Sequence, residues 1–87
     1  MGFYNKKKVT YKLVKEGKAV YIGTTNNPYR RNKEHSFSGK NYDYLEVTSP
    51  KLPKRTAEQQ ETRNLQSYKR ATGRKPKYNK TWDGKYH

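Results

Sequence analysis

The fold of this chain is decided by residues 9–23, which read VTYKLVKEGKAVYIG. The first six of these residues mix β-branched and aromatic side chains with polar ones, which predicts a strand with Val9, Tyr11 and Leu13 on one face. Gly17 can adopt a positive φ, so the middle of the stretch predicts a turn. The last five residues predict a second strand, and the whole stretch therefore predicts a β-hairpin.

The hairpin is followed by signals for a short helix and a third strand. Asn27 suits the N-cap and Pro28 the first helical position, so we expect a very basic helix from Pro28 to about Ser36. A loop then leads to residues 42–48, which read YDYLEVT and predict a third strand. Two prolines in the next five residues exclude regular structure there.

A longer helix is predicted over residues 57–71. Thr56 suits its cap, Gln59 stands three residues later as a capping-box partner, and Gly73 suits its C-terminal end. The complete order is strand, strand, helix, strand, helix. It predicts an α+β domain in which a small three-stranded antiparallel sheet is flanked by helices.

The composition fits one small domain and excludes several kinds of site. The chain has 87 residues, of which 29% are hydrophobic and 32% charged. It has no cysteine, which excludes a disulfide scaffold, a cysteine-based zinc site and a thiol nucleophile. No apolar run approaches the roughly 18 residues of a membrane span, and the first residues do not resemble a signal peptide. We therefore expect a cytoplasmic protein with no membrane partner.

The charge balance indicates a polyanionic partner. Lysine and arginine number 21 against seven acidic residues, which gives a net charge of +14. Nucleic acid is the first candidate, and an anionic membrane is weaker because no segment combines an apolar face with a basic one. We divide the chain into a basic N-terminal arm (1–8), one domain (9–79) and a basic, aromatic C-terminal tail (80–87).

One glutamate stands out in the second predicted helix. Glu61 falls on the same face as Ala57, Leu65 and Tyr68, at helical spacing. Glutamate is seldom buried unless it is paired or bound to a cation. Either Glu61 lies at the edge of this face and pairs with a lysine or arginine, or it holds a divalent cation. Mg²⁺ needs only one or two protein carboxylates, because water and phosphate oxygens complete its shell.

Four further residues are candidates for the same site. Tyr11 and Tyr21 lie on the two strands of the hairpin, and Arg31 and His35 share a face of the first helix at a spacing of four. Each also has an ordinary explanation. A strand tyrosine packs in the core, a helix arginine contacts phosphate or solvent, and a histidine near a helix C-terminus is favoured by the dipole.

In combination, these residues resemble the GIY-YIG nuclease family. The second tripeptide of the family is intact as Tyr21-Ile22-Gly23, and the first resembles Thr10-Tyr11-Lys12 in degenerate form. The two tyrosines are ten residues apart, which is typical of the family. Thr24 and Thr25 stand where many members carry a basic residue. The resemblance runs from about Val9 to Asn79, and its remaining matches are Arg31, His35, Glu61 and Asn79, the last of which resembles the asparagine that closes the family's core.

The resemblance implies a metal-dependent DNA endonuclease in which water attacks the phosphodiester with the help of one divalent cation. Glu61 would hold Mg²⁺ or Mn²⁺, and Arg31 would clamp a phosphate oxygen. Tyr11 is our preferred general base, with Tyr21 orienting water or phosphate and His35 accepting the proton. Catalysis by a tyrosine base predicts activity that rises with pH.

The remaining candidates would bind the nucleic acid. The partner would be duplex or branched DNA, bound by a monomer or a homodimer, and small modules of this family occur in phages and mobile elements. The alternatives are a non-catalytic DNA- or RNA-binding module and a ribosome-associated basic protein. Glu61 discriminates among them, because a pure binder has no use for a carboxylate that faces phosphates. The predicted nucleic-acid contacts are Arg30, Lys33, Lys54, Arg55, Lys77, Asn79 and Trp82.

Overall fold

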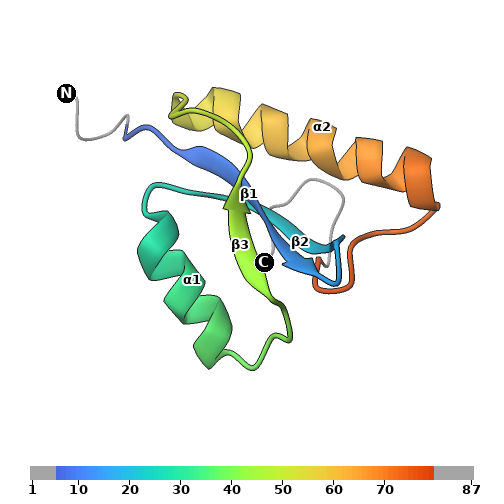
Figure 1. Ribbon diagram of the computed structural model, residues 1–87. Helices are drawn as coiled ribbons and strands as arrows, with labels where there is room; N and C mark the ends of the chain where they lie inside the picture. The colour runs from blue at the N-terminus through green and yellow to red at the C-terminus, as the bar shows by residue number, and fades with distance from the viewer. Residues whose placement is uncertain (1–5, 80–87) are drawn as a thin grey trace.

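A computed structural model describes residues 6–79 of the chain (Figure 1). It contains one antiparallel sheet with strand order β2-β1-β3 and two helices. The α+β class and the three-stranded antiparallel sheet predicted from the sequence are confirmed. In chain order the elements are β1 (Val9–Lys15), β2 (Lys18–Thr25), α1 (Pro28–Phe37), β3 (Tyr44–Val47) and α2 (Lys54–Thr72).

The hairpin of β1 and β2 is the centre of the molecule. Leu13 pairs with Tyr21 and Tyr11 pairs with Gly23, so these four residues lie on one face of the sheet. Tyr11, Leu13 and Tyr21 are buried and form the core cluster of that face. The turn has positive φ at both Glu16 and Gly17, which is the pattern of a tight hairpin connection.

The first helix begins as predicted. The Asn27 side chain accepts a hydrogen bond from the backbone N–H of Arg30 at 3.0 Å, and Pro28 takes the first helical position. In Figure 1, α1 lies beside β3, and it contacts that strand. The hydroxyl of Tyr42 donates to Asn32 of α1, at 2.8 Å to its backbone oxygen and 2.6 Å to its side-chain oxygen. The loop that leads to β3 is thereby fixed against the helix.

The third strand is shorter than predicted because the residues before it form other bonds. Tyr42 bonds to α1 instead of extending the strand. The Asp43 carboxylate accepts a hydrogen bond from the Glu16 backbone N–H at 2.8 Å and another from Lys15 Nζ at 3.3 Å. The bond from Glu16, followed by that from Lys15, holds the pKa of Asp43 below its usual range.

The second helix begins three residues earlier than predicted, and the prediction of Thr56 as its cap is wrong. Pro53 takes the N-cap position with φ −52, and its carbonyl oxygen accepts the first helical bond from the Ala57 N–H at 2.9 Å. Proline has this φ built in, so the helix starts without a side-chain cap. Gly73 ends the helix in the left-handed conformation, as expected.

The helix α2 packs along β2 and β1 and buries the face that its sequence indicated. Ala57, Glu61 and Leu65 are its buried residues, and Tyr68 is half-buried. Between residues 6 and 79, neither helix is long and apolar enough to cross a membrane.

Candidate active site

Two tyrosines and a histidine meet in the core between the hairpin and α1. The Tyr11 hydroxyl lies 2.6 Å from His35 Nε2, and this hydrogen bond is buried. The Tyr21 ring lies 4.7 Å from the His35 ring and 6.0 Å from the Tyr11 ring, measured between centroids. The three side chains, named here the tyrosine–histidine cluster, were all predicted as site residues, and the structure brings them together.

The hairpin register explains the glycine of the Tyr-Ile-Gly tripeptide. Gly23 lies opposite Tyr11 in the sheet, directly beneath the two phenol rings. A Cβ atom at this position would lie 2.8 Å from Tyr21 Cε2 and 2.9 Å from the Tyr11 hydroxyl. Contacts this short do not occur, so only glycine allows both tyrosines to keep these positions. The tripeptide therefore supplies the Tyr21 ring and, through Gly23, the space in which the Tyr21 and Tyr11 rings pack.

Burial keeps both phenols neutral. Burial raises the pKa of Tyr11 well above its ordinary value, with a further rise from Tyr21 and a smaller opposing effect of the Arg31 charge. Burial also raises the pKa of Tyr21, and the negative charge of Glu61 raises it further. The Tyr11 hydroxyl and then the Arg31 charge oppose this rise. At neutral pH a free tyrosinate is therefore disfavoured at either position. The same effects show that Arg31 and Glu61 lie within electrostatic range of both tyrosines.

Arg31 stands one helical turn before His35 on α1. Its Nε lies 3.3 Å from Glu34 Oε1, and its side chain is 36% exposed. An arginine in this position can turn toward an incoming phosphate without crossing the core. The exposed ion pair with Glu34 is worth little in solution, so it does not hold Arg31 in place against a stronger anion.

Glu61 belongs to α2, whereas the residues of the tyrosine–histidine cluster come from β1, β2 and α1. It is 2% exposed, which places it within the buried face of the helix and not at its edge. Between residues 6 and 79 no three His, Cys, Asp or Glu side chains gather as a metal cage. A single carboxylate is nevertheless enough for Mg²⁺ or Mn²⁺, which complete their shells with water and phosphate oxygens. The oxygen donor of Glu61 therefore fits such an ion.

Asn79 is buried and tied to the centre of β2. Its Oδ1 accepts a hydrogen bond from the Ile22 backbone N–H at 2.8 Å, and its Nδ2 donates to the Ile22 carbonyl oxygen at 2.9 Å. Both ends of the amide are thus used inside the protein, beside the Tyr-Ile-Gly tripeptide. This arrangement ties the residue to β2 and fits the asparagine that closes the core in the resemblance noted above.

The other predicted nucleic-acid contacts have separate surroundings. Lys33 Nζ lies 4.7 Å from the Tyr29 ring centroid on the exposed side of α1, and Lys77 Nζ lies 5.3 Å from the Tyr78 ring centroid. Arg30 lines a basic pocket that is described below. Three predicted contacts remain: Lys54 and Arg55 are exposed in the first turn of α2, and Trp82 lies outside the described residues.

One cation near the tyrosines was not predicted. Lys40, in the loop after α1, places its Nζ 5.6 Å from the Tyr21 ring centroid and 6.0 Å from that of Tyr78. Its Nζ also donates to Ser38 Oγ at 3.2 Å. No local pattern indicates this arrangement, because Lys40 reaches Tyr21 only through the path of the loop.

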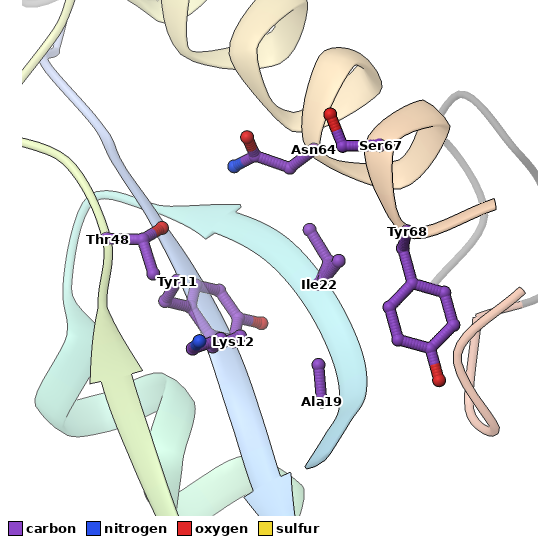
Figure 2. Close-up of a pocket in the computed structure, with 8 residues that line it drawn as sticks. All are labelled: Tyr11, Lys12, Ala19, Ile22, Thr48, Asn64, Ser67 and Tyr68. Carbon is purple, nitrogen blue, oxygen red and sulfur yellow. The ribbon is translucent and has the colours of Figure 1, made fainter. Parts of the chain in front are cut away.

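A separate hollow of about 360 Å³ lies between α2 and the sheet (Figure 2). Lys12 and Ile22 pair across β1 and β2, one residue from Tyr11 and Gly23, so they point to the other face of the sheet. Asn64 and Tyr68 of α2 line its helical side. Tyr11 also contributes to its lining, so the hollow borders the residue that carries one of the two phenols.

The fold and the cluster define the class of the protein. A three-stranded antiparallel sheet holds two tyrosines against a helix with an arginine and a histidine, which is the arrangement that the resemblance noted in the sequence implies. The family model of the GIY-YIG catalytic domain matches residues 7–58, more than half of the chain, and the chain belongs to this family. No curated protein and no solved structure matches the chain. Glu61 and Asn79 lie beyond the matched residues.

Proposed function

We propose that the protein is a DNA endonuclease that hydrolyses phosphodiester bonds with the help of one divalent cation, Mg²⁺ or Mn²⁺. The observation that carries the proposal is the buried 2.6 Å hydrogen bond between the Tyr11 hydroxyl and His35 Nε2, within electrostatic range of Arg31 and Glu61. A core without a reaction to perform would not need a phenol, an imidazole, a guanidinium and a carboxylate in one place.

The proton path in this proposal runs through Tyr11 to His35. Because burial raises the Tyr11 pKa, the phenol does not lose its proton to solvent beforehand. Instead, Tyr11 passes its proton to His35 Nε2 while it takes one from the attacking water. This requires His35 to be neutral with its proton on Nδ1, so that Nε2 is free to accept. The water oxygen bonds to phosphorus as the bond to the leaving oxygen breaks.

The remaining residues would bind and stabilise the phosphate. Arg31 donates charge-assisted hydrogen bonds to phosphate oxygens as negative charge builds up on them. Tyr21, whose ring packs on His35, orients the attacking water or the phosphate. Glu61 would hold the divalent cation, which when bound supplies a Lewis acid at the phosphate and at the leaving oxygen.

A non-catalytic nucleic-acid-binding module is the second candidate, and one observation favours it. Tyr11 and Tyr21 are each 1% exposed, so the phosphate must displace neighbouring side chains to reach their hydroxyls. In such a module the cluster would be a packed remnant of the family's site. The positive charge of the surface would then account for binding alone.

The two candidates are separated by nicking of supercoiled plasmid at low salt, without metal and with Mg²⁺ or Mn²⁺. The test variant is Glu61→Gln, and the matched control is Glu58→Gln, which removes an exposed carboxylate from the same helix. We expect metal-dependent nicking by the wild type and the control, and none by Glu61→Gln although it still binds DNA in a gel shift. Binding without cleavage in every metal, on plasmid and on branched DNA, would support the binding module.

A further inference from the structure

A second functional feature is a basic pocket at the start of α1, outside the tyrosine–histidine cluster. Its volume is about 490 Å³. Three segments of the chain meet there: the N-terminal arm, the connection from β2 into α1, and the loop between β3 and α2. Four of the six lining residues are cations and none is acidic. The lining residues are Lys6, Lys7, Asn26, Asn27, Arg30 and Lys51.

Hydrogen bonds order the segments that line the pocket. Lys8 and Leu52 exchange two bonds of 2.7 Å, which hold residue 8 against the loop that carries Lys51. In the connection from β2 into α1, the Asn27 N–H donates to Thr25 Oγ1 at 3.0 Å, and Asn27 Oδ1 accepts from the Arg30 N–H at 3.0 Å. Lys8 is therefore bonded to the folded domain, next to the two lysines that line the pocket.

The convergence of charge in this pocket is unfavourable for the free protein. Like charges held close together repel one another, and folding opposes such an arrangement unless an anion occupies it. Arg30 Nε lies 3.8 Å from Glu34 Oε2, but both side chains are more than half exposed. Such a pair contributes little and leaves Arg30 available. A fixed group of cations and amides around a hollow is suited to a phosphate, which accepts hydrogen bonds from each of them.

We propose that this pocket binds a backbone phosphate of DNA, distinct from the phosphate that reaches the tyrosine–histidine cluster. Arg30 and Arg31 are consecutive on α1, so their side chains diverge by about 100° around the helix. Arg30 lines the pocket, whereas Arg31 acts electrostatically on Tyr11 and Tyr21. One helix thus presents neighbouring cations to two phosphates of the same polymer. The pocket thereby holds the strand in position while the cluster acts on another phosphate.

The choice of DNA as the polymer rests on the proposed function, but the pocket can be tested without cleavage. We would measure binding of a short duplex by fluorescence anisotropy, without metal, over a series of salt concentrations. The test variant is Lys7→Gln with Lys51→Gln. The matched control is Lys18→Gln with Arg63→Gln, which removes two exposed charges outside the pocket. Circular dichroism verifies that both fold.

We expect the test variant to lose about tenfold in affinity at low salt and its salt slope to fall by about 1–2, while the control changes much less. In NMR titrations, inorganic phosphate should shift the amides of Asn26, Asn27 and Lys51 in the wild type but not in the test variant. Equal losses in both variants, or phosphate shifts spread over the whole surface, would overturn the proposal. If the test variant loses affinity for DNA but neither the wild type nor any variant nicks plasmid, the phosphate-binding pocket is supported and the proposed nuclease activity is not.

Discussion

The tyrosine–histidine cluster and the basic pocket share the short helix α1, which gives His35 to the first and Arg30 to the second, and they differ in almost every physical property. The cluster is buried, its phenols are neutral, and a 2.6 Å hydrogen bond fixes its geometry. The pocket is open and strongly positive. Backbone hydrogen bonds between Lys8 and Leu52 join two of the segments that carry its lysines. The difference teaches how a small domain can separate its tasks: chemistry needs desolvated groups in fixed positions, whereas binding of a polyanion needs charge in contact with solvent.

The largest expected effect of breaking the cluster is on the rate of cleavage. Tyr11→Phe keeps the ring in place and removes the hydroxyl that bonds to His35. We expect a loss of about 10²–10⁴ in cleavage rate, which is the usual contribution of a positioned proton-transfer group. Affinity for DNA should change less than twofold because the pocket is untouched. A rate within tenfold of the wild type, measured at saturating protein, would exclude Tyr11 from the proton path.

The second expected effect is on stability, and it tests the steric requirement for glycine at position 23 beside the cluster. Gly23→Ala would place a methyl group 2.8 Å from Tyr21 Cε2 and force the two rings apart. We expect a loss of about 1–3 kcal/mol in the free energy of unfolding, together with loss of cleavage. Urea denaturation measures the first quantity. Thr24→Ala on the same strand is the control, and equal stability of both variants would contradict the steric account.

A third change tests whether Asn79 supports the hairpin or contacts DNA. Asn79→Ala removes both hydrogen bonds to Ile22 and leaves its buried backbone groups without these partners. We expect a loss of about 1–3 kcal/mol in stability with affinity for duplex DNA nearly unchanged. The exposed Asn41→Ala is the matched control. Weakened DNA binding at unchanged stability would reverse this assignment.

The smallest effect is the dependence of cleavage on pH. Because burial raises the Tyr11 pKa, its neutral form persists to higher pH than in a free tyrosine, and the rate should stay level from neutral pH to about pH 10. Rates at saturating protein and metal from pH 5.5 to 10 test this. A continued rise from pH 8 to 10 would indicate a tyrosinate base.

The sequence predicted the parts of this comparison that follow from local periodicity. Alternation along the hairpin put Tyr11 and Tyr21 on one face, and helical spacing put Glu61 on the buried face of α2. The start of α2 was missed because Pro53 fixes its own backbone angle and replaces the expected cap. Lys40 and the basic pocket could not be predicted, because both depend on how loops distant in sequence come together.

The most direct test of the account is single-turnover cleavage at saturating protein, with Mn²⁺, for the wild type, Glu61→Gln and the Lys7→Gln, Lys51→Gln variant. Saturation removes differences in affinity and leaves the chemical step. The account predicts that the lysine variant regains the wild-type rate to within a few-fold, whereas Glu61→Gln stays inactive. Cleavage by Glu61→Gln at the wild-type rate would contradict the assignment of chemistry to the buried cluster and its glutamate.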